Sequence, residues 1–201
     1  MQNEFTNAER AEVLTQALPN IRKYSGKIVV VKYGGNAIGL SGMDGRLIEA
    51  EQKKEKLGYV GEITKINIAP VTDLLERGYI PVISTVGCDE EGNTYNINGD
   101  TAAAHIAGAL GAERLILMTD IAGILRDRND PATLIPELSI RDADQLLAQG
   151  IISGGMIPKV DCCVLAIRCG VESAIIMDGR VPHSILMELL TDEGAGTMVR
   201  S

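Results

Sequence analysis

The sequence predicts an α/β fold: a three-layer αβα sandwich around a mostly parallel central sheet. Continuous aliphatic runs of strand length alternate with amphipathic runs of helical length, which is the pattern of strand–helix–strand units. Aromatic residues make up only 3% of the chain, so the core must be built from Val, Ile, Leu and Ala, as in buried parallel strands. In such folds ligands bind at the carboxyl ends of the strands.

Composition limits the kind of protein this is. With 201 residues, 45% hydrophobic and 23% charged, the chain is long enough to bury a core and should fold as one domain or two small lobes. The formal net charge of −8 and the lack of a basic, aromatic-rich window argue against nucleic-acid binding, so small molecules or proteins are the expected partners. No apolar run reaches membrane-spanning length and the N-terminus is polar, so we expect no membrane association and a cytoplasmic location.

The four cysteines are expected to be reduced thiols in the core. The spacing of Cys88, Cys162, Cys163 and Cys169 matches neither a zinc site nor a disulfide framework. We therefore assign no metal-binding residues.

The first half of the chain mixes strands with two helices. A helix over residues 7–24, with Asn7 as its N-cap, leads into an aliphatic strand over 28–32. A second short strand over 37–41 follows after a very short link. Two strands joined by so short a link cannot run parallel to each other. The remaining elements expected here are strands over 46–55 and 59–68 that form a hairpin, a helix over 70–77 closed by Gly78, and a buried strand over 79–86.

The second half alternates more regularly between strand and helix. The elements expected there are a helix over 100–110, a strand over 114–118, helices over 142–149 and 156–169, a strand over 173–177 and a helix over 183–190. We expect His105 and His183, which fall on two of these helices, to be structural rather than catalytic. No Ser or Cys nucleophile has a recognisable base partner.

The first candidate site is the end of the strand over 28–32. Lys32 is followed by Gly34 and Gly35, so a cation lies beside backbone amides that no Cβ shields. Phosphoryl transfer needs this combination of positive charge and amide donors. The alternative is a solvent-exposed lysine before a tight glycine turn.

The second candidate site is the NINGD segment before the Ala-rich helix. Asn96 and Asn98 alternate on an extended segment, so their side chains should point the same way and could grip a polar ligand. Asp100 is well placed as the N-cap of the helix. The alternative is a cap and turn without any catalytic role.

The third candidate site is the segment SGGMIPK. Gly154 and Gly155 lead through Met156 into a helix whose first turn carries Lys159. Free amides, the helix dipole and a lysine then converge on one point, which favours a phosphate. The spacing is not that of a Walker motif, and a capped helix with an exposed lysine is the alternative.

The fourth candidate is Asp120, which follows a buried strand and precedes a glycine-containing turn. At the carboxyl end of a strand it could meet the ribose or amino group of a nucleotide, or it could be an ordinary turn carboxylate.

The lack of a recognisable general base is compatible with one kind of phosphoryl transfer. A carboxylate substrate is already ionised at neutral pH, so an enzyme that phosphorylates a carboxylate needs cations and amide donors but no general base.

A resemblance to the N-acetylglutamate kinases, a branch of the amino-acid kinase family, spans nearly the whole chain. It is carried by the motifs VVVKYGGNA, AIGLSGMDG, GYVGEI, GYIPVIS, YNINGDTAA, LILMTDIAGIL, SGGMIPKV and DGRVPHSILMELLTDEGAGTM. The resemblance implies ATP-dependent phosphorylation of the γ-carboxylate of N-acetyl-L-glutamate in arginine biosynthesis, with Mg²⁺ carried by the nucleotide. It also implies three parts: an N-terminal helical arm over 1–25, an acyl-substrate lobe over 26–112 and a nucleotide lobe over 113–201.

The resemblance also implies roles for the candidate residues. Lys32 and Lys159 would stabilise the transferring phosphoryl group, and Asp100 would orient both lysines. The substrate would be bound by Asn96, Asn98, Gly34 and Gly35. The nucleotide would be bound by Asp120, Ile121, Ala122, Gly123, Ile124 and Leu125, together with Gly154, Gly155, Met156 and the turn that precedes them.

The leading helix and the TDEGAGTM ending resemble the arginine-sensitive, hexameric members of the family. This implies a homo-oligomer in which L-arginine binds as an inhibitor between the two segments. Glu193 could pair with the arginine guanidinium. The other residues implied in this effector site are Tyr24, His183, Gly194 and Gly196. The GYVGEI and DEGAGTM neighbourhoods are also similar to those of relatives controlled by the PII signalling protein.

One segment departs from the family pattern. In the family, a helix, a strand with a second glycine loop, a substrate lid and a long dimer helix separate the motifs KYGGNA and AIGLSG, whereas here Ala37 runs directly into Ile38. The acyl-substrate lobe is therefore expected to be incomplete. A second interpretation therefore stays open, in which the protein is a non-catalytic remnant that binds nucleotide or arginine and assembles with intact subunits. A third is another amino-acid kinase, such as a relative of glutamate 5-kinase or carbamate kinase.

Overall fold

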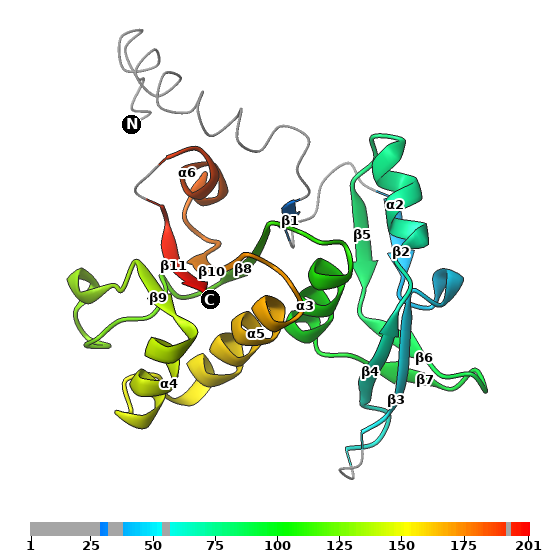
Figure 1. Cartoon of the computed structure of the whole chain (residues 1–201), viewed down its shortest axis with the longest axis horizontal. Coiled ribbons are helices and arrows are strands. Elements are labelled where there is room, and N and C mark those ends of the chain that lie inside the picture. The colour runs from blue at the N-terminus through cyan, green and yellow to red at the C-terminus, as the bar shows by residue number, and fades with distance from the viewer. Residues whose placement is uncertain (1–28, 32–37, 54–56, 192–193) are drawn as a thin grey trace, which may run out of the picture.

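The structure is a computed structural model that describes residues 29–31, 38–53, 57–191 and 194–201. It confirms the α/β class, with strands and helices alternating along the chain (Figure 1). A larger part holds the C-terminal half together with the strand over 29–31, and a smaller part holds the strands between residues 38 and 96, with helix α3 (Gly99–Ala109) between the two parts (Figure 1). The expected helix over 7–24 and the N-terminal arm lie outside the described residues.

The larger part is built on a five-stranded sheet. Strand β10 is its middle strand. On one side β8 pairs with it in parallel and is followed by β1, also parallel; on the other side β11 pairs antiparallel with β10 and parallel with β9. The strands of this sheet, in spatial order, are β1 (Val29–Val31), β8 (Arg114–Thr119), β10 (Ser173–Asp178), β11 (Gly196–Arg200) and β9 (Glu137–Ser139).

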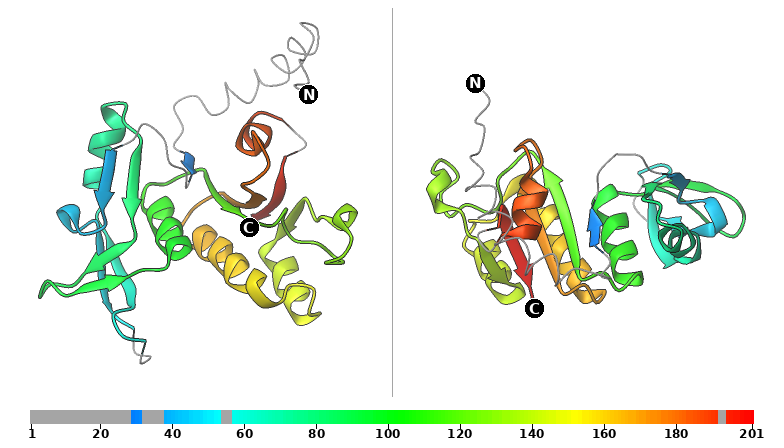
Figure 2. Two further views of the ribbon diagram at one scale, coloured as in Figure 1. Left: turned by 180° about the vertical axis from the view of Figure 1, so that it is seen from behind. Right: turned by 90° about the horizontal axis from the view of Figure 1, so that it is seen from above.

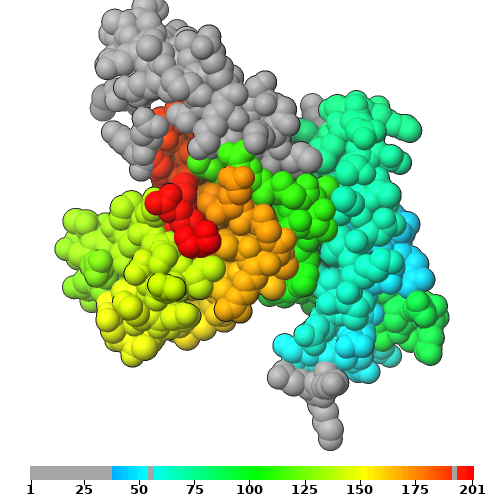
Figure 3. Space-filling model, viewed as in Figure 1, coloured from blue at the N-terminus to red at the C-terminus, as the bar shows by residue number. Residues whose placement is uncertain are grey.

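Helices cover both faces of this sheet, which makes it a sandwich. On one face, Leu115 and Leu117 of β8 pack into a core with α3, α4 and α5. On the other face, Ile116 packs with Ile185 and Leu189 of α6 (Figure 2). Strand β11 also contacts α5, and the space-filling view shows the C-terminal residues (red) beside the segment that contains α5 (orange and yellow) (Figure 3). The helices that complete the layers are α4 (Ile140–Ala148), α5 (Ile157–Arg168) and α6 (Ser184–Leu190).

The smaller part contains the predicted hairpin and a separate two-stranded sheet. Strands β3 and β4 pair antiparallel, and β6 and β7 extend them to a four-stranded sheet, while β2 pairs in parallel with β5. The elements are β2 (Ile38–Ser41), β3 (Ile48–Gln52), β4 (Gly61–Ile66), α2 (Ala69–Glu76), β5 (Pro81–Ser84), β6 (Val86–Cys88) and β7 (Thr94–Asn96). Short 3-10 helices cover Asp44–Arg46, Pro131–Thr133 and Gly154–Met156.

The prediction of one buried strand over 79–86 is wrong. The run divides into β5 and β6, which belong to different sheets. Ile80 is 60% exposed and Val82 is 39% exposed. The reason is that residues 81–84 pair with β2, whereas residues 86–88 pair with β3 and β7, so the run is shared between two sheets. The predicted central sheet is likewise divided into three sheets over the described part of the chain, and β1 and β2 lie in different ones.

Close packing of α3 against α5 joins the core of the larger part to the smaller part. At Gly108 of α3, a Cβ would lie 2.4 Å from the Cβ of Cys169 and 2.8 Å from its carbonyl oxygen, so only glycine allows this approach. The cysteines are free thiols as predicted, but Cys169 is partly exposed whereas the other three are buried. No helix in the part of the chain that the structure describes is long and apolar enough to span a membrane.

Candidate functional site

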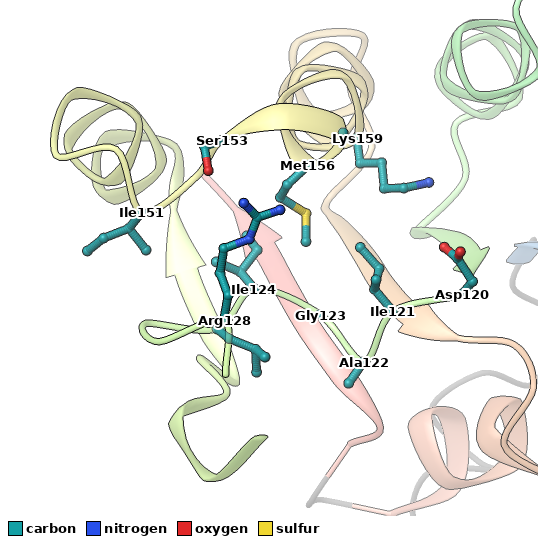
Figure 4. Close-up of a pocket in the computed structure, with 12 residues that line it drawn as sticks. Asp120, Ile121, Ala122, Gly123, Ile124, Arg128, Ile151, Ser153, Met156 and Lys159 are labelled. Atoms are coloured by element: carbon teal, nitrogen blue, oxygen red, sulfur yellow. The ribbon is translucent and has the colours of Figure 1, made fainter. Parts of the chain in front are cut away.

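A cleft of about 290 Å³ opens at the carboxyl end of β8 (Figure 4). Its two walls are the segment that follows β8 and the turn that leads into α5. The lining residues are Asp120, Ile121, Ala122, Gly123, Ile124, Leu125, Arg128, Ile151, Ser153, Gly155, Met156 and Lys159. Two segments that the sequence singled out separately therefore form one site.

Residues 120–125, called the cleft segment below, form the first wall. The segment leaves β8 at Thr119, whose hydroxyl accepts a hydrogen bond from the Ile121 amide at 3.2 Å. Gly123 has a φ of +148°, and a Cβ there would lie 2.5 Å from Oγ1 of Thr197. A side chain at position 123 would therefore clash with β11 behind the cleft, which explains why the turn requires glycine.

The turn before α5 forms the second wall. Gly154 has a φ of +58°, the left-handed conformation that glycine adopts without strain. Gly154 itself does not line the cleft, whereas Gly155 and Met156 do. Pro158 lies in the first turn of α5, where its missing N–H costs little, and Lys159 follows it.

Opposite ends of the cleft carry a cation each. Figure 4 shows Lys159 extending toward Asp120 at one end and the guanidinium of Arg128 beneath Ser153 at the other. Between them the wall is largely apolar, with Ile121 and Met156 contributing side chains. The cleft thus offers a hydrophobic slot with a lysine at the positive end of a helix, which suits a ligand with a flat apolar body and an anionic tail.

Arg128 is a cleft residue that the sequence analysis missed. It lies in a charged loop after the cleft segment, and its Nη2 is the atom nearest to a Cβ built on Gly154, at 3.9 Å. No pattern in the sequence marks it, because its place depends on how the loop folds back over the glycine turn.

The N-cap of α3 is Asn98, so the prediction that Asp100 caps this helix is wrong. Oδ1 of Asn98 accepts hydrogen bonds from the amides of Asp100 at 3.0 Å and Thr101 at 3.1 Å. The backbone leaves the helical conformation at Asn98, with a ψ of 130°, so the capping position falls two residues earlier than expected. The Asp100 carboxylate lies in the first turn, next to the positive end of the helix.

Asp100 and Lys159 both lie close to Cys162 of α5. The Cys162 thiol donates a hydrogen bond to the carbonyl oxygen of Asp100 at 3.0 Å. The pKa of Cys162 is raised to about 12, chiefly by burial and also by the negative charge of Asp100, while the positive charge of Lys159 opposes the shift. The first turns of α3 and α5 are therefore neighbours, which brings the second and third candidate sites together.

The loop after β10 approaches the cleft segment from outside the cleft. Arg180 donates from Nη2 to the carbonyl oxygen of Asp120 at 2.5 Å. Its guanidinium also makes two hydrogen bonds to the carboxylate of Asp178, which hold the pKa of Asp178 at about 2. Sequence reasoning missed Arg180 because its contact crosses 60 positions.

Several predicted residues are not brought into the cleft. Asn96 and Asn98 are exposed and alternate with the buried Tyr95 and Ile97, so they share one face as predicted. Neither lines the cleft. Lys32, Gly34 and Gly35 lie outside the described residues.

The predicted effector residues are described only in part. Tyr24 and Glu193 lie outside the described residues. His183 precedes α6 with a φ of 62° and is exposed, and Gly194 has a φ of +69°. Gly196 begins β11.

Next to this group, Glu188 of α6 is 5% exposed and accepts a hydrogen bond from the Ala195 amide at 2.8 Å. Its carboxylate also lies 3.5 Å from Nη1 of Arg114. The turn before β11 is thereby held against α6. Partial burial lowers the pKa of His105 in α3.

In the part of the chain that the structure describes, no group of three or more His, Cys, Asp or Glu side chains is placed so that it could hold a metal ion. Asp120 is the only carboxylate among the residues that line the cleft.

The fold and the cleft together define a class of protein. The chain belongs to the amino acid kinase family, whose model matches residues 4–178. Within that family it is 56% identical over 167 residues to the acetylglutamate kinase of Thermosynechococcus vestitus, covering 83% of this chain and 57% of that one. It is also 49% identical over 197 residues to the acetylglutamate kinase of Synechococcus elongatus, covering 96% of this chain and 65% of that one. The chain thus spans about three fifths of the length of the curated relatives it matches.

Solved structures agree on the fold. N-acetylglutamate synthase from Neisseria gonorrhoeae complexed with coenzyme A and N-acetyl-glutamate superimposes with a TM-score of 0.69 at 24% identity, covering 97% of this chain and 44% of that one. Isopentenyl phosphate kinase superimposes with a TM-score of 0.58 at 22% identity, covering 94% of this chain and 66% of that one. Both similarities support the fold alone.

Proposed function

We propose that the protein is a cytoplasmic kinase of arginine biosynthesis that phosphorylates the γ-carboxylate of N-acetyl-L-glutamate with MgATP. One observation carries the proposal: the strand-end segment with Asp120 and the helix-start segment with Lys159 form one apolar cleft with a lysine at a helix N-terminus. Identity of 49–56% to acetylglutamate kinases supports the choice of substrate.

The cleft suggests how ATP would lie. Adenine and ribose would occupy the apolar slot between Ile121 and Met156, with the Asp120 carboxylate accepting a hydrogen bond from the nucleotide. The triphosphate would run toward Lys159, where the lysine charge and the positive end of α5 favour an anion. Mg²⁺ bound to the triphosphate would supply further charge neutralisation.

The proposed chemistry is a direct phosphoryl transfer. An oxygen of the ionised γ-carboxylate forms a bond to the γ-phosphorus of ATP while the bond from that phosphorus to the bridging oxygen breaks, which gives the acyl phosphate and ADP. No proton has to be removed, so no general base is needed. Lys159, with Lys32 from outside the described residues, would stabilise the equatorial oxygens, and Asp100 would orient both lysines.

The remaining assignments are proposals on the same basis. Asn96 and Asn98, on one exposed face before α3, would bind the acylated substrate together with Gly34 and Gly35. The arginine effector would bind among Tyr24, His183, Glu193, Gly194 and Gly196. One fold relative, N-acetylglutamate synthase from Neisseria gonorrhoeae, is known in complex with coenzyme A and L-arginine, at 25% identity and a TM-score of 0.69. We extend the proposal to a homo-oligomer and to control by a PII signalling protein.

A second candidate function is a non-catalytic subunit that binds nucleotide or arginine and assembles with intact subunits. Two observations favour it. Ala37 runs directly into Ile38, where the family carries a second glycine loop and a substrate lid. In addition, Val82 of β5 is 39% exposed.

Trapping the acyl phosphate with hydroxylamine tests the catalytic proposal. We expect MgATP-dependent hydroxamate from N-acetyl-L-glutamate, lost in Lys159→Ala and kept in the matched variant Lys65→Ala, whose lysine is exposed on the hairpin and pairs with Glu49. Calorimetric titration with MgATP runs in parallel. Nucleotide binding without hydroxamate would favour the non-catalytic subunit, and failure of both would contradict the nucleotide site itself.

A further inference from the structure

The cleft segment is held from behind by two side chains that do not line the cleft. Arg180, after β10, holds its first peptide, and Thr197, on β11, holds its far end. Neither residue is among those that line the cleft. Both belong to C-terminal segments far away in the sequence, so the wall that would receive the nucleotide depends on residues that would not touch it.

At the near end, both polar groups of one peptide bond are fixed. The carbonyl oxygen of Asp120 accepts from Nη2 of Arg180 at 2.5 Å, and the amide of Ile121 donates to the Thr119 hydroxyl at 3.2 Å. A peptide held at both its oxygen and its N–H cannot rotate without losing one of the two bonds. The orientation of this peptide sets the direction in which the Asp120 side chain leaves the backbone.

The guanidinium that makes this contact is itself oriented in advance. Although Arg180 is 69% exposed, its Nε and Nη2 donate to the two carboxylate oxygens of Asp178 at 2.9 and 2.8 Å. The amide of Gly179 donates to the carbonyl oxygen of Thr119 at 2.8 Å, which joins the ends of β8 and β10. Bidentate pairing of this kind fixes the plane of an arginine better than a single ion pair does.

At the far end, the hydroxyl of Thr197 bridges two backbone segments. It accepts from the Ile124 amide at 2.8 Å and donates to the Ile135 carbonyl oxygen at 2.7 Å. The Ile135 amide in turn donates to the Ile124 carbonyl oxygen at 2.8 Å. Thr197 is fully buried, so no water can replace its hydroxyl if it is removed.

We propose that Arg180 and Thr197 are positioning residues that set the affinity for the nucleotide by fixing the cleft segment at both ends. The inference rests on the proposed nucleotide site and adds to it two residues that act through the backbone. A shift of the segment by a fraction of an ångström would spoil the fit of the slot and the direction of Asp120 together. The effect should therefore fall on nucleotide affinity and on KM for ATP more than on the turnover number.

Matched pairs of variants test this inference. Thr197→Val keeps the shape and removes the hydroxyl, whereas Thr197→Ser keeps the hydroxyl and removes a methyl group. Arg180→Ala is compared with Arg200→Ala, which removes an exposed arginine paired with Glu137 on the same sheet but away from the cleft segment. The measurements are the dissociation constant of MgATP by calorimetry, kcat and KM, and the thermal midpoint.

We expect Thr197→Val and Arg180→Ala to weaken MgATP binding about tenfold or more, the scale of one or two lost hydrogen bonds. Thr197→Ser and Arg200→Ala should stay within about twofold. If Thr197→Val does not fold, Arg180→Ala still tests the inference, because the side chain that it removes is exposed. A lower thermal midpoint with unchanged MgATP affinity in Arg180→Ala would overturn the inference and leave the proposed function intact. No MgATP binding by the unmodified protein would overturn both.

Discussion

The thiol of Cys162 donates a hydrogen bond to the carbonyl oxygen of Asp100 across 3.0 Å. This contact joins the first turn of α3 to the first turns of α5, where Lys159 lies. The residue that we propose to orient the lysines is thus in direct contact with the helix that carries Lys159. Because burial raises the pKa of Cys162 to about 12, the thiol stays protonated and remains a donor throughout the physiological range.

Selective alkylation tests whether this helix contact stays closed in solution. We expect iodoacetamide at about pH 8 to modify Cys169 in the native protein while leaving Cys88, Cys162 and Cys163 intact, since the thiolate is the nucleophile and those three are buried. The unfolded protein should be modified at all 4 cysteines. Peptide mass spectrometry reads each site. Equal modification of Cys162 and Cys169 in the native protein would show that α3 and α5 separate.

A second prediction concerns the contact of Gly108 with Cys169. Gly108→Ala should lower the free energy of unfolding by about 1–3 kcal/mol, because the new Cβ meets a Cβ and a backbone oxygen that cannot rotate away. The gain in helix propensity offsets at most about 1 kcal/mol of this cost.

The matched control for that prediction is Gly39→Ala, where nothing lies within 4 Å of the new Cβ. It should change the stability by no more than about 0.5 kcal/mol. Urea unfolding measures both variants. Equal stability of the two would mean that α3 and α5 pack less closely than the structure shows.

The pair of Asp178 with Arg180 predicts a pH dependence of stability. The hydrogen bonds from Arg180 lower the pKa of Asp178 from 3.8 to about 2, so the carboxylate binds its proton more weakly in the folded state than in the unfolded state. Its contribution is therefore fully present above about pH 4 and is lost as the pH falls toward 2. Urea unfolding of the unmodified protein and of Asp178→Asn across this range should give a difference that shrinks as the pH falls. A difference independent of pH would contradict the pairing.

The sequence predicts the strongest elements of the larger part well. Strands β8 and β10 end within one residue of their expected bounds, because continuous aliphatic runs buried on both faces leave little choice. The segments around Asp120 and Lys159 were also predicted separately, and the structure brings them into one cleft. Local sequence patterns are therefore enough to predict candidate site residues that lie at the end of a strand or at the start of a helix.

The parts that could not be predicted depend on contacts between distant residues. The Thr197 hydroxyl accepts a hydrogen bond from the Ile124 amide, although the two residues are 73 positions apart in the sequence. No spacing pattern in the sequence predicts such a contact. The division of the run over 79–86 into β5 and β6 likewise depends on which neighbours are available to pair with each strand. Strand β9 has only three residues, too few for a periodic signal.

The choice of cap on α3 gives the last prediction. Asn98 and Asp100 are both good capping residues, and only the backbone turn at Asn98 decides between them. Asn98→Ala should lower the free energy of unfolding by about 1 kcal/mol, because the amides of Asp100 and Thr101 lose their acceptor. Asn98→Asp keeps an acceptor and should be close to neutral.

Asp100→Asn separates the cap from the proposed chemistry. Its stability should change by less than about 1 kcal/mol, because the carboxylate only interacts with the helix dipole and makes no cap. Hydroxamate formation should fall about a hundredfold or more if the charge of Asp100 orients the lysines. Thermal unfolding and the hydroxamate assay on the same preparations give both values. A normal rate of hydroxamate formation in Asp100→Asn would contradict the proposed role, because the variant removes the charge that is proposed to orient the lysines.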